Sequence, residues 1–160
     1  MPHERWLNGA DYLKRSDGTL FVTEPSSGSV FKVILNACDG SKADAVSELT
    51  GHPRTHGIAL IPGEDIAFVS RSEANTVDVF EPSSMKRVGV VPVAEDADAI
   101  LYDPSANIVY VSNGDAGVAT LIDPVHRISV GTIALGGKPG FAVFDQITKS
   151  GTLILRPTQA

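Results

Sequence analysis

Two short segments of the sequence carry side chains that could do chemistry. These side chains are His52, Arg54 and His56 in GHPRTHG (51–57), and Glu95, Asp96 and Asp98 in AEDADA (94–99). Imidazole and carboxylate groups act as general bases and as the groups that orient such bases. The residue types therefore allow proton-transfer chemistry, as in a hydrolase or an isomerase, with His56 as the base and Asp98 as the acid that orients it.

A metal site is a second interpretation of the same residues. His52 and His56 with Asp96 and Asp98 would form a mixed nitrogen and oxygen ligand set suited to a divalent ion. No spaced motif such as His-Glu-x-x-His is present, and Cys38, the single cysteine, excludes a Cys-rich zinc site and an intrachain disulfide. We therefore predict no metal and no cofactor, and keep His52, His56 and Asp96 as the alternative ligand set.

The elements that hold these residues belong to a repeat. The segment DIAFVSRSEANTVDVFEP (65–82) matches NIVYVSNGDAGVATLIDP (107–124) at an offset of 42 residues. The same pattern occurs earlier as GTLFVTEPSSGSVFKVI (18–34), which places Phe21, Phe68 and Tyr110 at equivalent positions, 47 and then 42 residues apart. Self-similarity at this period is the sequence signature of a repeat architecture.

Each repeat contains four short strands. One apolar strand precedes each matched pair, at 56–61, 98–102 and 140–144, and another follows at 86–93 and 127–135. Alternating apolar residues with frequent turn residues predict an all-β antiparallel protein, and four-stranded units of about 40 residues are typical of β-propeller blades. Residues 1–160 should thus form a single partial propeller domain. Its blades should span about 8–51, 54–96 and 97–137, with an incomplete fourth at 138–160.

The third unit resembles the YVTN β-propeller repeat family. The stretch NIVYVSNGDAGVATLIDPVHRISVGTIALGGKP carries the Tyr-Val-Ser/Thr-Asn strand end, the apolar strand ending in Ile-Asp and the Val-Gly to Pro turn of that pattern, and the second unit is similar through HGIALIPGEDIAFVS and TVDVFEP. The resemblance implies a closed ring of about seven blades. It also implies relatives that include surface, periplasmic and sugar-lactone-processing proteins, so a lactonase-like hydrolase or isomerase with His56 and Asp98 is the alternative function.

About 3.5 blades form an incomplete ring, which leaves open blade faces and strand edges. Three arrangements would cover them: a homodimer of two half-rings, a different propeller segment, or a longer natural chain. We therefore predict a partner that is either a second copy of the chain or another propeller segment.

In a propeller, the loops that lead into the innermost strands share one face with the loops between strands two and three. The predicted binding residues at this channel mouth are Arg54, His56, Arg71, Asp96, Asp98, Asn113 and Lys138, with Glu95 and Asp115 beside them. Convergent polar groups at a channel mouth are the usual form of a small-molecule site. The preferred function is a non-catalytic module that binds a ligand or a protein through this face.

Ser70 and Ser112 occupy the same position in two successive repeats. A catalytic nucleophile needs to occur only once, whereas a structural residue recurs with the repeat. We therefore expect both serines to have a structural role at strand ends.

The charge balance argues against several partner classes. Thirteen basic and nineteen acidic residues give a net charge of −6, so no broad cationic surface is available for nucleic acid. Nowhere does an apolar run approach the roughly 18 residues of a membrane helix, and the first residues lack the apolar stretch of a signal peptide. As written, the sequence predicts a cytoplasmic protein, or a periplasmic or secreted one if it derives from a longer precursor.

Overall fold

The computed structural model describes the backbone of residues 12–16, 18–35, 43–51, 54–145 and 150–155, and the side chains of 18–34, 47–51 and 54–139. All of the regular secondary structure in these described residues is β-strand. The first sheet contains β1 (Tyr12–Ser16), β2 (Thr19–Glu24), β3 (Ser29–Leu35) and β4 (Ala43–Leu49). The second contains β5 (Thr55–Leu60), β6 (Ala67–Arg71), β7 (Thr76–Glu81) and β8 (Lys86–Pro92). The third contains β9 (Ala97–Asp103), β10 (Ile108–Asn113), β11 (Val118–Asp123) and β12 (Ile128–Ala134), and the fourth contains β13 (Pro139–Asp145) and β14 (Ser150–Leu155).

The sheets are the blades of a β-propeller. Strand order follows the sequence in each sheet, and all neighbouring strands are antiparallel. We call the sheets the first to fourth blades; the first three have four strands and the fourth has two. The predicted fold class, an all-β propeller with four-stranded antiparallel blades in an incomplete ring, is confirmed.

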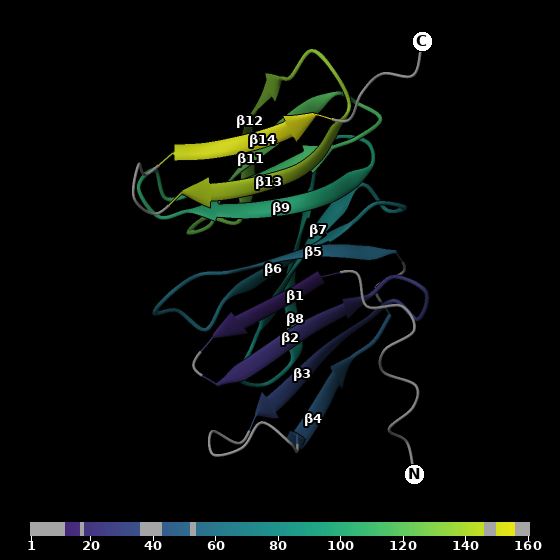
Figure 1. Cartoon of the computed structure of the whole chain (residues 1–160), viewed down its shortest axis with the longest axis vertical. Helices are drawn as coiled ribbons and strands as arrows, with labels where there is room; N and C mark the ends of the chain where they lie inside the picture. Colours follow the sequence, from purple (N-terminus) through teal and green to yellow (C-terminus); the bar gives the residue numbers. More distant parts are fainter. Residues whose placement is uncertain (1–11, 17, 36–42, 52–53, 146–149, 156–160) are drawn as a thin grey trace.

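The first strand of each blade lies on the inside of the arc. β1 packs against β5, β5 against β9, and β9 against β13, so these strands form a continuous inner wall. The blades follow one another along the long axis of the molecule, from β4 at one end to β14 and β12 at the other (Figure 1). Among the described residues, no helix is long and apolar enough to span a membrane.

Two apolar cores fill the spaces between the blades. Between the first and second blades lie Phe21, Val30, Ile58, Ala67, Val69, Phe80 and Met85. Between the second and third lie Ala59, Ile61, Phe68, Val77, Val79, Val91, Ala97, Ile100, Val109, Val111 and Ile122. Successive side chains of β6 alternate between the two cores, because a strand points its side chains to opposite faces. The second blade is therefore buried on both sides.

The outer side of the third blade is only partly covered. Val91 on β8 and Ile133 on β12 occupy equivalent repeat positions, 42 residues apart. Their pairing partners, Val77 and Ala119, are also 42 residues apart. The third blade covers Val91, which is 1% exposed, whereas Ile133 is 46% exposed. Among the described strands, β13 packs on β9 and β10 and so covers the inner half of this side. We call the uncovered part, around Ile133 on β12, the open face.

Hydroxyl groups connect successive blades. Thr23 Oγ1 on β2 donates a hydrogen bond of 2.5 Å to the carbonyl oxygen of His56 on β5. Ser70 Oγ on β6 donates to the carbonyl oxygen of Asp98 on β9, at the equivalent position of the next pair of blades. We call these the forward hydroxyl bonds, because each runs from the second strand of one blade to the first strand of the next.

Candidate functional site

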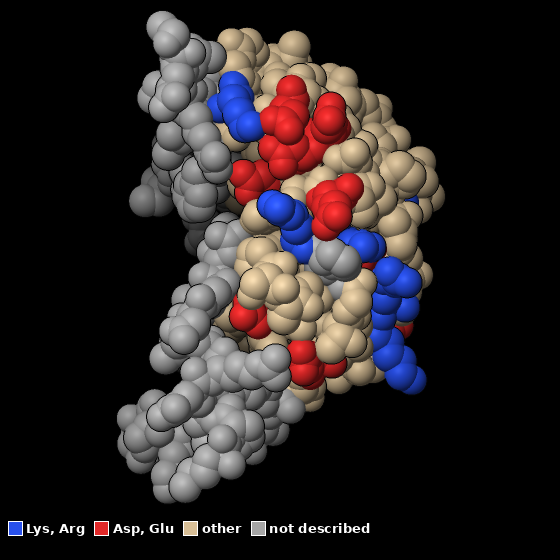
Figure 2. All heavy atoms as spheres, turned by 90° about the vertical axis from the view of Figure 1, so that its right-hand side faces the viewer, with Lys and Arg blue, Asp and Glu red and all other residues tan. Residues whose placement is uncertain are grey.

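The candidate site lies on the face at which the first strand of each blade begins (Figure 2). Acidic side chains gather there at the height of the third blade, with basic side chains above and below them. Glu95, Asp115 and Lys138 are exposed on this side of the chain, and His56 and Asp98 are partly exposed. The face therefore presents both signs of charge close together.

Close packing of two inner strands places His56 beside Asp98. The pairing of β5 with β6 shifts register between Thr55 and Ile58, which marks a β-bulge at His56 and Gly57. A Cβ atom on Gly57 would lie 2.8 Å from both the backbone nitrogen and Cγ2 of Ile100. Only glycine allows β5 to come this close to β9, so Gly57 fixes the distance between the two functional side chains.

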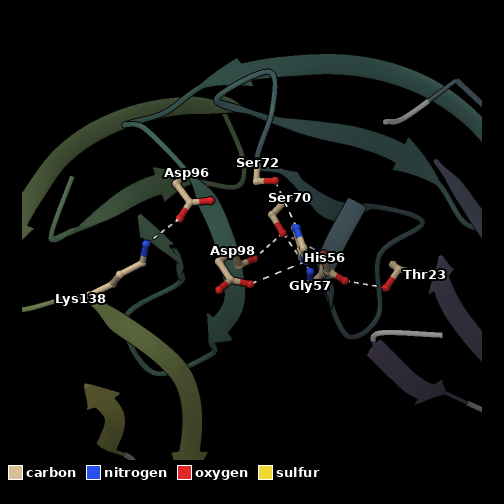
Figure 3. Close-up of polar contacts among 8 residues, drawn as sticks. All are labelled: Thr23, His56, Gly57, Ser70, Ser72, Asp96, Asp98 and Lys138. Atoms are coloured by element: carbon tan, nitrogen blue, oxygen red, sulfur yellow. Dashed lines mark hydrogen bonds and ion pairs between the residues drawn. The ribbon is translucent and has the colours of Figure 1, made fainter. Parts of the chain in front are cut away.

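His56 lies between a hydroxyl and a carboxylate (Figure 3). Its Nε2 atom is 3.1 Å from Ser72 Oγ, which is hydrogen-bonding distance. Its Nδ1 atom is 3.9 Å from Asp98 Oδ1, which is within ion-pairing range but longer than a hydrogen bond. The side chains of His56 and Asp98 are 24% and 23% exposed. Ser72, His56 and Asp98 thus form a series, which we call the hydroxyl–imidazole–carboxylate series, that reaches solvent.

The backbone on both sides of the imidazole is fixed by hydrogen bonds. Thr23 binds the carbonyl of His56, and Ser70 Oγ accepts a 2.9 Å hydrogen bond from the Gly57 N–H while donating to the Asp98 carbonyl. The bulge leaves the Gly57 N–H without a ladder partner, and Ser70 supplies one. The structural role predicted for Ser70 is therefore confirmed, and it supports the site next to it.

A second polar group brings together residues from the second, third and fourth blades. Lys138 Nζ lies 2.5 Å from Asp115 Oδ1. The same atom lies 3.8 Å from Asp96 Oδ2 (Figure 3). Gly114 makes room for this arrangement, since a Cβ there would collide with the Asp96 carboxylate. The Asp96 N–H is in turn held by Asn75 Oδ1 at 2.9 Å. Three of the residues predicted for the mouth are therefore in contact.

The repeat places different charges at equivalent points around the mouth. Arg54, Asp96 and Lys138 are spaced by 42 residues, and Arg54 and Asp96 share a left-handed backbone, with φ of 53° and 60°. Lys138 meets Asp115, whereas the equivalent residue near Arg54 is Ser26. Arg54 and Ser26 line a hollow of about 620 Å³ at the junction of the first and second blades. The mouth therefore changes in charge from one blade junction to the next.

Two predicted binding residues need correction. Asn113 is fully buried: its Nδ2 donates to the Ala94 carbonyl, and its Oδ1 accepts from the backbone and the hydroxyl of Thr120. Arg71, whose side chain is 15% exposed, lies 3.3 Å from the buried carboxylate of Asp78. Both residues end a second strand and point between the blades; Asn113 therefore presents no surface to a ligand, and Arg71 presents only a small part of its side chain.

The metal hypothesis finds no support in the described residues. Within them, no group of three or more His, Cys, Asp or Glu side chains is arranged to hold an ion. Asp96, one of the predicted ligands, is instead paired with Lys138. His52 lies outside the described residues.

Sequence reasoning missed Ser72. Its repeat equivalents are Pro25 and Gly114, so no recurring pattern draws attention to it. Its contact with His56 depends on the bulge in β5, which changes the direction of the histidine side chain. The signal available in the sequence is a difference between repeats: Ser72 carries a hydroxyl at a position where the neighbouring blades have none.

Comparison with known proteins identifies a fold and no family. No protein-family model matches the chain, and neither does any curated protein. The chain is similar to hydrazine synthase of Kuenenia stuttgartiensis, with a TM-score of 0.82 and 19% identity over 95% of this chain and 43% of that one. A chain in the mitotic checkpoint complex gives a TM-score of 0.70 and 15% identity over 86% of this chain and 41% of that one. The chain thus spans less than half the length of these structures, and the resemblance to the YVTN repeat stays a prediction.

Proposed function

We propose that this chain is a β-propeller segment that acts by binding: it completes its ring with a second propeller segment and presents the channel mouth to a ligand or protein. The contrast between Val91 and Ile133 carries the first half of this proposal. The same repeat position is 1% exposed where a four-stranded blade follows and 46% exposed at the open face, where the following blade has two described strands. Apolar surface of this kind is stabilised by burial against a partner.

A second copy of the chain is the simplest partner to test. Two arcs of about 3.5 blades would give a ring of about seven, which lies within the usual range for propellers. The partner would have to bring strands that cover the open face, as the third blade covers Val91. A different propeller segment, or further blades of a longer chain, would cover the same residues.

The mouth supports the second half of the proposal. Asp96, Asp115 and Lys138 form a preassembled group of both charges, and Arg54 lies beside a separate hollow. Such a surface suits a polar ligand or a protein loop that carries both donors and acceptors. Nucleic acid does not suit it, because the acidic groups would repel phosphates.

Light scattering across a concentration series tests ring completion by self-association. We expect a mass of twice 16.8 kDa for the unmodified chain. Ile133→Asp should weaken the dimer by placing a charge in the buried contact, whereas Val125→Asp should leave it unchanged, because Val125 is 62% exposed in the turn before β12. A monomer at every concentration would contradict self-association and leave another propeller segment as the partner.

A further inference from the structure

Beyond binding, the geometry points to an acyl-transfer site in which Ser72 is the nucleophile, His56 is the general base and Asp98 is the positioning residue. The substrates would be carboxylic esters, whose acyl group a serine hydroxyl can accept. The inference does not rest on the proposed binding function. It rests on the contacts of these three side chains within the second and third blades.

The imidazole has the two neighbours that nucleophilic catalysis needs. Ser72 Oγ lies 3.1 Å from Nε2, so the hydroxyl can give its proton to His56 when the Nδ1 nitrogen carries the other proton. Asp98 Oδ1, 3.9 Å from Nδ1, favours that tautomer and stabilises the imidazolium that forms. A nucleophile, a base and an acid that orients the base recur in this relation on unrelated folds.

The surrounding structure holds these groups in place. The carbonyls of His56 and Asp98 accept the forward hydroxyl bonds from Thr23 and Ser70. Gly57 sets the separation of β5 and β9, because any larger residue would collide with Ile100. Rigid strands with buried supporting hydrogen bonds give the positioning that a catalytic group requires.

The repeat shows that the fold itself does not require this arrangement. The two residues at positions equivalent to Ser70, Thr23 and Ser112, also carry a hydroxyl, and the role of Ser70 is structural. Ser72 has Pro25 and Gly114 at its equivalent positions, and His56 has Asp98 and a glycine. A hydroxyl and an imidazole that occur once, and contact each other, are the pattern expected of a catalytic pair.

The reaction balances with the ester and water alone. As Ser72 Oγ bonds to the acyl carbon, its proton moves to His56 Nε2; the ester C–O bond then breaks and the leaving alcohol takes that proton. Water next attacks the acyl group on Ser72 by the same route in reverse, which releases the carboxylic acid and restores the serine hydroxyl. No metal or redox cofactor takes part in this sequence.

Fluorophosphonate labelling of the 160-residue chain tests the nucleophile directly. We expect a covalent adduct that peptide mapping by mass spectrometry places on Ser72, with no adduct on Ser84, an exposed serine that bonds only a carboxylate, that of Glu81, among the described contacts. Intact folded protein is labelled, so no variant needs to fold for this experiment. An unlabelled Ser72 would overturn the proposal.

Hydrolysis of 4-nitrophenyl acetate tests the base and the positioning residue. Ser72→Ala and His56→Ala should each reduce kcat by about 100-fold or more, and added imidazole should restore part of the His56→Ala activity. Asp98→Asn should lower kcat without changing KM, since it acts through His56, and Ser84→Ala should match the unmodified chain. Circular dichroism should show unchanged folding for all four variants. Equal rates for the folded Ser72→Ala variant and the unmodified chain would refute the assignment.

The two proposals fail independently. Ser72, His56 and Asp98 all lie in the second and third blades, whose common interface is complete within one chain. Loss of dimerisation in Ile133→Asp should therefore leave the labelling of Ser72 unchanged. Labelling that disappears with the dimer would show that the site needs the completed ring, and would overturn the assignment to a single chain.

Discussion

Removing the Ser70 hydroxyl should destabilise the junction of the second and third blades. Ser70 is fully buried; its Oγ accepts from the Gly57 N–H at 2.9 Å and donates to the Asp98 carbonyl. The Ser70→Ala variant would leave that N–H buried with no ladder partner, since the bulge removes it from the pairing of β5 with β6. The Asp98 carbonyl would lose one donor as well.

The magnitude follows from these two groups. A buried donor left without a partner costs about 1–3 kcal/mol, and a lost hydrogen bond to a partly buried carbonyl adds about 1 kcal/mol. We therefore expect Ser70→Ala to lower the free energy of unfolding by about 3 kcal/mol. That is a large part of the roughly 5–15 kcal/mol that stabilises an ordinary domain.

Urea denaturation monitored by circular dichroism measures this loss, with two variants as controls. Ser84→Ala removes a hydroxyl that bonds only the exposed Glu81 carboxylate among its described contacts and should change stability by less than about 0.5 kcal/mol. Ser70→Thr keeps the hydroxyl and should retain most of the stability, as Thr23 makes the equivalent bond in the first blade. If Ser70→Ala and Ser84→Ala unfold at the same urea concentration, the forward hydroxyl bonds do not stabilise the blades and the reasoning fails.

Three further predictions have defined outcomes. Gly57→Ala should cost at least about 1–3 kcal/mol in thermal or urea unfolding, because its Cβ would meet the Ile100 backbone at 2.8 Å; a neutral result would contradict the close packing of β5 and β9. Asp78→Thr should cost about 3 kcal/mol by leaving Arg71 without this carboxylate, and adding Arg71→Asn should recover part of that loss, since the third blade carries Asn and Thr at these positions; additive losses would show that the pairs are not interchangeable. Burial raises the pKa of Asp103, but hydrogen bonds from its neighbours outweigh it and hold the pKa below the ordinary value. Asp103→Asn should therefore lower the free energy of unfolding at pH 7, and the difference should begin to shrink near pH 4, at about the ordinary pKa, and be lost as the pH falls through the lowered pKa of the folded state.

The fold could be predicted because the repeat is visible in the sequence. Phe21 and Phe68 recur at one position, and the structure buries both between blades, each pointing to the following blade. A sheet that is buried on both faces needs a neighbouring sheet on each side. Few architectures therefore accommodate a repeat of 42 residues that contains four strands. The strand pattern, the repeat period and the burial of these phenylalanines all agree with the propeller fold.

The site could be predicted only in part. His56, Asp98, Asp96 and Lys138 were identified because turns before inner strands must share one end of a propeller. Which side chains point outward could not be predicted, because a bulge shifts the alternation of a strand by one residue. Arg71 lies at a strand end beside the mouth and nevertheless points between the blades, toward a partner seven residues away in sequence.

The forward hydroxyl bonds give the arc a direction. The second blade contributes an acceptor carbonyl, that of His56, to its junction with the first blade and a donor, Ser70 Oγ, to its junction with the third, so its two sides differ. Contacts between unlike surfaces join subunits head to tail and close into rings, whereas a two-fold pairing of identical faces needs a self-complementary surface. We therefore expect the assembly of such arcs to be polar, with the trailing side of one arc meeting the leading side of the next.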